Sequence, residues 1–143
     1  MLQSQAKKKG IFIMPEENVV SAENNQTEST ENKDFIIEKN VLKKYLGTDS
    51  HVLVPDDITA IGDGAFKNQK KIITVTLPES ITSIGHYAFS GCRSLTSIEI
   101  PETVTIIGDY AFNGCKRLPV IDIPESVRKI GRGAFSSTML IIN

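Results

Sequence analysis

The sequence has few cysteines and no long apolar run. Cys92 and Cys115 are its two cysteines, too few for the disulfide-rich scaffold of a small secreted domain. The longest apolar run near the start is IFIM, residues 11–14. This run is shorter than the apolar core of a signal peptide and far shorter than the ~20 residues that span a bilayer. We therefore expect no membrane insertion, and no export signal or anchor indicates the compartment.

An excess of one charge is also missing. Lysine and arginine number 16 against 17 aspartate and glutamate residues, which gives a formal net charge of -1. A protein with this balance has no overall positive field to attract the phosphates of nucleic acids or an anionic lipid surface. The composition therefore predicts no nucleic-acid partner.

What the sequence does contain is an internal repeat. The segments PDDITAIGDGAF, PESITSIGHYAF, PETVTIIGDYAF and PESVRKIGRGAF begin at Pro55, Pro78, Pro101 and Pro124, each 23 residues after the one before. Four copies at one fixed period indicate a solenoid, in which each copy packs against its neighbours. The last copy is incomplete, because the sequence ends before a full strand and the proline that follows the strand in the other copies.

Composition divides the chain into three parts. Residues 1–33 are rich in Glu, Asn, Ser and Thr and poor in large apolar side chains, so we expect a disordered tail or linker. Residues 34–54 contain FII and VLKKY joined by EKN, which predicts an N-terminal capping hairpin with a turn at Asn40, followed by a first strand. Residues 55–143 are the repeats.

The apolar positions within a copy indicate how each coil is built. The alternation at Ile98 and Ile100 recurs in the other copies and predicts a short strand with one inward face, so that stacked copies form a parallel sheet. One glycine per copy is predicted to occupy a tight bend where a Cβ would be strained. These glycines are Gly62, Gly85, Gly108 and Gly131. The predicted fold class is an α/β repeat, a right-handed solenoid with a short parallel sheet on its concave face and short helical or 3-10 turns on its convex side.

The copies resemble the leucine-rich repeats of the BspA-like family, whose unit runs approximately L-x-x-I-x-I-P-x-x-V-x-x-I-G-x-x-A-F-x-G-C. The resemblance covers the chain from Pro55 onward and extends to the segment before it, from Phe35 to Val54. The first copy departs from the pattern, with NQKK at residues 68–71 where the next two have GCRS and GCKR. The resemblance implies partners such as extracellular matrix or cell-surface proteins, a role in adhesion, and a secreted or cell-surface location.

The outward residues of the predicted strands are candidates for binding a partner, because solenoids bind through their concave surface. They form two stripes. The first stripe is His51, Thr74, Ser97 and Val120, and the second stripe is Leu53, Thr76, Glu99 and Asp122. A basic rim precedes the strands and an acidic rim follows them. The basic rim is Lys70, Arg93 and Lys116, and the acidic rim is Asp56, Glu79, Glu102 and Glu125. We expect a partner of matching charge polarity, oriented by the rims; the alternative is that these residues form only a solvated surface.

No set of residues indicates catalysis. His51 and His86 occupy different repeat positions in different copies, so the two-histidine pattern of a metal site is absent. No nucleophile, base and metal ligand converge, and we expect no catalytic residue, no cofactor and no metal. Cys92 and Cys115 share one repeat position in adjacent coils and are predicted to be buried thiols. The alternative is a disulfide, because adjacent coils lie about 4.8 Å apart.

Two functional hypotheses follow. The first is a non-enzymatic module for protein–protein interaction or adhesion, which binds through its concave face. The alternative is a structural spacer, or a fragment of a longer array, without a ligand of its own. The incomplete last coil also predicts self-association through an uncapped end bearing Met139, Leu140 and Ile142, because unpaired strand edges attract other chains.

Overall fold

A computed structural model describes residues 33–138 and 141–142 of the 143-residue chain. The tail or linker predicted for residues 1–33 therefore lies outside the described residues, except for Lys33. From Phe35 onward the chain forms one compact unit. Its strands are β2 (Phe35–Glu38), β3 (Val41–Tyr45), β4 (His51–Leu53), β5 (Ala60–Ile61), β6 (Thr74–Thr76), β7 (Ser83–Ile84), β8 (Ser97–Ile98), β9 (Ile106–Ile107), β10 (Val120–Ile121), β11 (Lys129–Ile130) and β12 (Ile141–Ile142).

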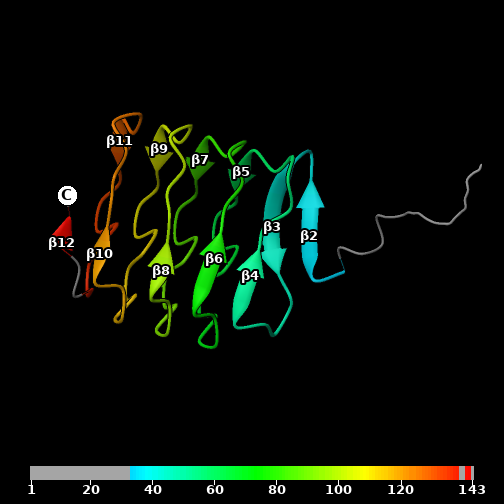
Figure 1. The fold of residues 1–143 in the computed structure, drawn as a ribbon, viewed down its shortest axis with the longest axis horizontal. Helices are drawn as coiled ribbons and strands as arrows, with labels where there is room; N and C mark the ends of the chain where they lie inside the picture. The colour runs from blue at the N-terminus through cyan, green and yellow to red at the C-terminus, as the bar shows by residue number, and fades with distance from the viewer. Residues whose placement is uncertain (1–32, 139–140, 143) are drawn as a thin grey trace, which may run out of the picture. The chain divides into compact units, whose positions relative to one another are not determined.

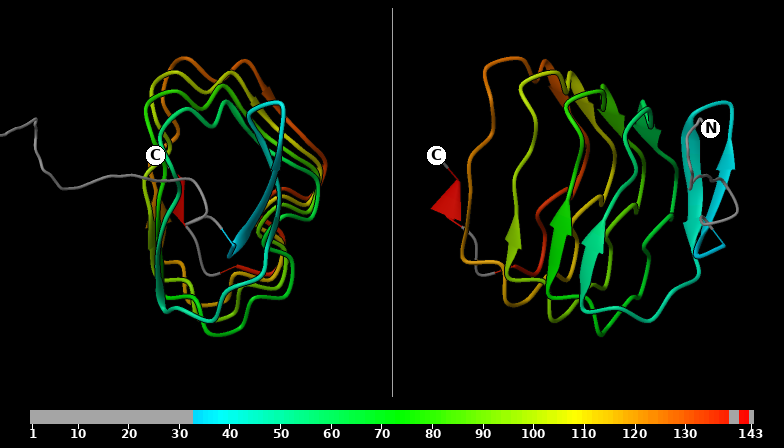
Figure 2. Two further views of the ribbon diagram at one scale, coloured as in Figure 1. Left: turned by 90° about the vertical axis from the view of Figure 1, so that its right-hand side faces the viewer. Right: turned by 45° about the vertical axis from the view of Figure 1, so that its right-hand side comes forward.

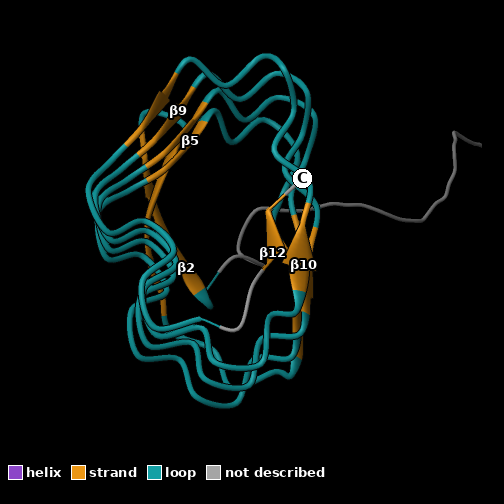
Figure 3. Cartoon of the chain, turned by 90° about the vertical axis from the view of Figure 1, so that its left-hand side faces the viewer, coloured by secondary structure: helices purple, strands orange, loops and turns teal. Residues whose placement is uncertain are grey.

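The chain winds into a stack of coils, and successive coils superpose when they are viewed along the stack (Figure 2). Two parallel ladders run along different sides of the stack (Figure 1 and Figure 3). One ladder contains β4, β6 and β8, with His51, Thr74 and Ser97 side by side. This sheet confirms the predicted parallel solenoid, in which partners are one repeat apart in the sequence.

The second ladder is not expected from the alternation of apolar residues. It contains β5, β7, β9 and β11, whose strands are two residues long, and it continues through β3 to β2. Ala60 pairs with Ser83, and Ser83 pairs with Ile106, again at the repeat offset. Where both ladders are present, the backbone of one coil is tied to the next coil at two separate places.

A β-hairpin begins the stack, as the sequence predicts. Strands β2 and β3 pair antiparallel, and the turn between them places Lys39 and Asn40 at φ values of 51° and 66°. Two consecutive residues with positive φ are typical of the tight turns that match the twist of hairpin strands. Strand β3 then pairs parallel with β5, so that Leu42 lies beside Ile61.

The core is a column of apolar side chains that runs through the coils. Its most regular part is a series of aromatic rings with neighbouring centroids 5.0–5.4 Å apart. The rings belong to Phe35, Tyr45, Phe66, Phe89, Phe112 and Phe135. Phe66, Phe89 and Phe112 are fully buried, because each ring is covered by the equivalent ring of a neighbouring coil. A single coil buries only its inward side chains, so its stability depends on this stacking.

The segments after the glycine of each coil form turns, and the described residues contain no helix (Figure 3). The helical turns predicted for the convex side are therefore not confirmed. The backbone N–H of Phe89 donates to Ala111 O of the next coil at 2.7 Å, whereas the following N–H, that of Ser90, closes a local turn on Tyr87 O at 3.1 Å. Because donors of this segment alternate between neighbouring coils and local turns, a continuous series of helical hydrogen bonds cannot form.

The glycines for which a tight bend was predicted, Gly62, Gly85, Gly108 and Gly131, have a different structural role. Gly108 is not among the residues with positive φ. A Cβ on Gly108 would lie 2.6 Å from the backbone nitrogen of His86 in the preceding coil. These glycines therefore permit neighbouring backbones to approach each other, and strain in a tight bend is not what requires them.

The last described strand, β12, pairs parallel with β10. Met139 and Leu140, which carry the prediction of self-association, lie outside the described residues, as does the side chain of Ile142. Self-association through this end therefore stays a prediction. Among the described residues, no helix has the length and apolar character needed to cross a membrane.

Candidate functional site

The outward residues of β4, β6 and β8, with those that follow each strand, form one surface, which we name the strand face. His51, Thr74 and Ser97 are in register along it, and a hydrogen bond of 2.8 Å joins His51 Nδ1 to Thr74 Oγ1. In the second stripe, Leu53 is 71% exposed, and the other three members are also exposed. They are Thr76, Glu99 and Asp122. Val120 belongs to β10, but its side chain is not described.

The sheet on this face is interrupted between β8 and β10. No strand pairing joins these two neighbours among the described residues, and β10 pairs only with β12. In the preceding coils, the N–H of Ile73 donates to Ser50 O at 2.6 Å and the N–H of Thr96 donates to Ile73 O at 2.8 Å. Pro119 occupies the next equivalent position and has no N–H to donate. The predicted parallel sheet is therefore interrupted between β8 and β10, where a proline replaces the residue whose N–H crosses to the preceding coil.

A groove of about 590 Å³ lies at this interruption, and we name it the acidic groove. Its floor includes Leu77, Ile98 and Ile100, which are slightly exposed there. Four carboxylates line it, and none of the described residues that line it is basic. They belong to Glu79, Glu99, Glu102 and Asp122. Four carboxylates gathered on one surface favour a cationic partner.

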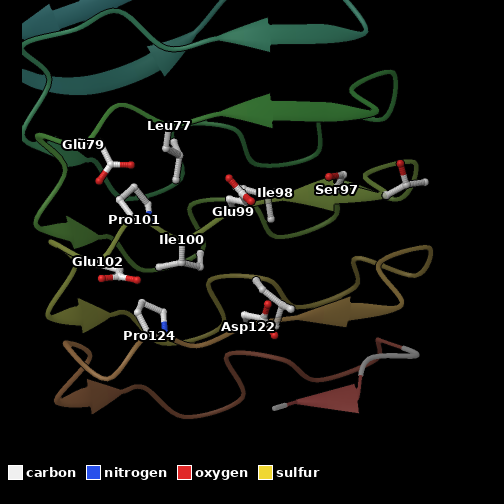
Figure 4. Close-up of a pocket in the computed structure, with 12 residues that line it drawn as sticks. Leu77, Glu79, Ser97, Ile98, Glu99, Ile100, Pro101, Glu102, Asp122 and Pro124 are labelled. Atoms are coloured by element: carbon white, nitrogen blue, oxygen red, sulfur yellow. The ribbon is translucent and has the colours of Figure 1, made fainter.

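Figure 4 shows how these side chains are arranged. Glu79 and Glu102 lie beside the prolines that follow the strands, whereas Glu99 and Asp122 lie on neighbouring coils nearer to the strands. The structure thus brings two members of the predicted stripe together with two members of the predicted acidic rim. Asp56 and Glu125 of the same rim are exposed but do not line the groove.

The basic rim lies at the opposite ends of the strands. Lys70, Arg93 and Lys116 are exposed and line a second groove of about 340 Å³, which is named the basic groove below. The sequence predicts these cations as a rim. It does not predict that serine and asparagine side chains would form the rest of the lining.

His86 links neighbouring coils by hydrogen bonds. Its backbone N–H donates to Asp63 Oδ1 at 2.8 Å, and its Nδ1 accepts from the N–H of Asp109 at 2.8 Å. Asp109 Oδ1 in turn accepts from the N–H of Arg132 at 2.9 Å. Each side chain at this repeat position therefore holds the backbone of the next coil, and His86 carries its proton on Nε2 when it accepts at Nδ1.

The two cysteines are buried free thiols, as predicted, and no disulfide joins them. The Sγ of Cys92 donates to Phe66 O at 3.1 Å, and the Sγ of Cys115 donates to Phe89 O at 3.2 Å. Burial raises the pKa of each thiol to about 12 from an ordinary value of 9.0, because the thiolate would lose its hydration. Thiols with so high a pKa are protonated near neutral pH and are poor nucleophiles.

Among residues 33–138 and 141–142, no group of three or more histidine, cysteine, aspartate or glutamate side chains is placed to hold a metal ion. What this part of the chain does offer is two charged grooves of opposite sign at the two ends of the strands. Surfaces of this kind recognise partners by shape and charge.

Solved structures of leucine-rich repeat proteins share this fold. A protein from T. pallidum is 27% identical with a TM-score of 0.64, and the match covers 77% of this chain and 68% of that one. A protein from Bacteroides capillosus is 29% identical with a TM-score of 0.64, covering 76% and 92% of the two chains. A protein from Bacteroides ovatus is 30% identical with a TM-score of 0.65, covering 76% of this chain and 31% of that one.

A search among curated proteins found no match. The sequence profile of BspA type leucine-rich repeat regions, in contrast, matches residues 35–143 as six copies. The match therefore includes the hairpin segment that precedes Pro55, where the first of the four copies described above begins. The profile and the parallel solenoid agree: the chain belongs to the BspA type leucine-rich repeat family.

Proposed function

We propose that the chain is a non-enzymatic protein-binding module whose strand face holds an extended, basic segment of a partner protein in the acidic groove. The observation that carries this proposal is the groove itself, about 590 Å³ in volume and lined by four carboxylates. Repeat solenoids commonly bind proteins along such a surface, which supports the class of partner. The family resemblance suggests extracellular matrix or cell-surface proteins as the source of that segment.

The interrupted ladder supports an extended shape for the partner segment. Strand edges that lack a neighbouring strand bind extended peptides by main-chain hydrogen bonds, and the side chains beside the edge set specificity. Glu99 lies on the β8 side of the interruption and Asp122 on the β10 side, so lysine or arginine side chains of a bound segment would lie between carboxylates. These pairs would set orientation and association rate more than total affinity.

The test is direct binding of the full chain to a panel of purified matrix and cell-surface proteins, measured by surface plasmon resonance at low and physiological salt. The groove variant is Glu99→Lys with Asp122→Lys. The matched control is Asp56→Lys with Glu125→Lys, which changes the net charge equally at exposed positions outside the groove. Circular dichroism and thermal unfolding check that both variants fold as the parent does.

We expect the groove variant to weaken binding at least about ten-fold, or roughly 1.4 kcal/mol, while the control stays close to the parent. Equal binding by all three proteins would overturn the proposal. An equal loss in both variants would show that net charge and not the groove matters. If the parent binds no protein of the panel, the spacer hypothesis gains and the groove has no protein partner of this class.

A further inference from the structure

The basic groove crosses three successive coils at the ends of the strands that lie away from the acidic groove. It has a volume of about 340 Å³, and no carboxylate is among the described residues that line it. The side chains that line it are Asn68, Lys70, Ser90, Arg93, Asn113 and Lys116. Glycines at 91 and 114 complete the lining, so no side chain fills the floor at these two positions. The groove is thus open, cationic and polar.

The floor of this groove is built on a rigid backbone. The N–H of Asn68 donates to Ser90 O at 2.7 Å, and the N–H of Gly91 donates to Asn113 O at 2.8 Å. These bonds hold three coils at a fixed spacing beneath the cationic side chains. A Cβ on Gly91 would meet the side-chain oxygen of Asn68, so a larger residue there would fill the groove.

Ser90 supplies an independent sign of a ligand. Ser90 is among the residues that line the groove although it is only 6% exposed, and it is the one polar residue that is buried in the described part of the chain. Within that part, its hydroxyl makes no hydrogen bond to a described residue. A buried polar group without a partner costs free energy, and native proteins rarely keep one unless a water or a ligand satisfies it.

The cations form a row and not a single point of charge. Lys70, Arg93 and Lys116 occupy the same position in adjacent coils, about 4.8 Å apart along the stack. Like charges at this spacing repel one another, and a linear anion lying along the row would remove the repulsion. Arginine adds a planar pair of donors that fits sulfate or carboxylate oxygens.

We propose that the basic groove binds a segment of a sulfated polysaccharide. The row of cations matches anionic groups repeated along a chain, and the hydroxyl of Ser90 and the amides of Asn68 and Asn113 match sugar hydroxyls and sulfate oxygens. This site is separate from the protein-binding strand face and does not depend on it.

Single-stranded nucleic acid fits the groove less well. Proteins that bind it without sequence preference stack bases on aromatic side chains, and no aromatic side chain lines this groove. Tyr87 is exposed and Tyr110 of the next coil is partly buried; their rings stack on each other at 5.2 Å, and Lys67 Nζ lies 5.0 Å from the Tyr87 ring. Their faces are already in contact with protein groups.

The experiment uses heparin as the probe, with neutral dextran and a single-stranded oligonucleotide as comparison ligands, and titrates the full chain by calorimetry over a series of salt concentrations. The groove variant is Lys70→Gln, Arg93→Gln and Lys116→Gln. The matched control is Arg128→Gln, Lys129→Gln and Arg132→Gln, which removes three exposed charges that do not line the groove.

We expect the groove variant to lose at least about ten-fold in heparin affinity and to lower the slope of log affinity against log salt by about 2 to 3. The control should keep the affinity within about two-fold, and dextran should not bind. Equal losses in both variants, or no loss in the groove variant, would overturn the proposal. An oligonucleotide that binds as tightly as heparin would instead assign the groove to a phosphate backbone.

Ser90→Ala provides a second readout that separates a ligand site from a general charge effect. We expect it to weaken heparin binding about two- to five-fold while the melting temperature stays equal or rises, because a buried hydroxyl without a partner is removed. A variant with lower melting temperature and unchanged heparin binding would show that the hydroxyl serves the fold alone, and would remove this support for the site.

Discussion

The two ends of the stack differ in how they cover the same core position. Ile61 in the first coil is 1% exposed, whereas Ile130, its equivalent three coils later, is 46% exposed. At the first coil, β3 pairs with β5 and places Leu42 beside Ile61, and β2 then pairs with the free edge of β3. One antiparallel strand is therefore enough to complete the burial that a repeat cannot achieve alone.

The aromatic column gives the same contrast. Phe112 is fully buried between Phe89 and Phe135, with ring centroids 5.2 and 5.4 Å away. Phe135 has Phe112 on one side and is only partly buried. At the other end, the hairpin brings Phe35 against Tyr45 and so ends the column with an additional ring. Stability in this fold is therefore highest in the middle and depends at each end on what covers the last coil.

The largest effect that tests this contrast is expected from truncating an interior ring. Phe89→Ala removes a fully buried ring with stacked neighbours at 5.0 and 5.2 Å, and we expect a loss of about 3–5 kcal/mol in the free energy of unfolding. Urea unfolding followed by circular dichroism measures it.

Phe135→Ala is the matched control, because it makes the same chemical change at the same repeat position. We expect a loss of only about 1–2 kcal/mol there, since the ring is partly buried and, among the described residues, stacks on one other ring. Equal losses for the two variants would mean that the last coil is covered as completely as the interior, and the contrast between middle and end would be wrong.

The repeat period shows why so much of this fold can be predicted from the sequence. A side chain such as Phe89 recurs at a fixed spacing because it packs on its own equivalent in the next coil, so the spacing predicts the stack, the inward residues and the buried cysteines. The hairpin is also predictable, because residues such as Asn40 mark a turn by local chemistry.

The features that could not be predicted depend on hydrogen bonds between coils. The turns that replace helices and the second ladder arise from donors whose partners lie one repeat away, which no local pattern shows. The break at Pro119 had a visible signal, a proline at the position of Ile73 and Thr96, but its effect required knowing that this N–H crosses the stack. The burial of the Ser90 hydroxyl could be recognised only in the structure.

An intermediate effect is expected at the cap. The Tyr45 hydroxyl accepts a hydrogen bond from the N–H of Asp49 at 3.0 Å, and the side chain is 2% exposed. Tyr45→Phe leaves that N–H without this acceptor, and we expect a loss of about 1–2 kcal/mol in the free energy of unfolding, measured by urea titration. Tyr87→Phe makes the same change on a 40% exposed residue and should alter stability by less than about 0.5 kcal/mol. Were the two variants equally stable, the hydroxyl would not help to hold the cap on the first coil.

Ionisation of the two thiols is expected to have the smallest effect on the free energy of unfolding at neutral pH. This effect is confined to the interior coils. Cys92 and Cys115 occupy a repeat position that the first and last coils fill with Gln69 and Thr138. Because burial raises both thiol pKa values to about 12 from 9.0, the folded state keeps protons that the unfolded state releases above pH 9. The thiols should therefore leave stability constant below pH 8 and lower it by about 1 kcal/mol per thiol near pH 10.

Urea unfolding between pH 7 and 10.5 measures this effect by comparing the parent with Cys92→Ala and Cys115→Ala. Each variant should be less stable than the parent at pH 7, because a buried side chain is shortened, but should lose less stability on going to pH 10. Identical pH profiles for parent and variants would show that the thiols ionise as readily in the folded chain as in the unfolded one. The interior coils would then be open to solvent at this position, and the contrast between covered middle and exposed end would fail where the structure makes it strongest.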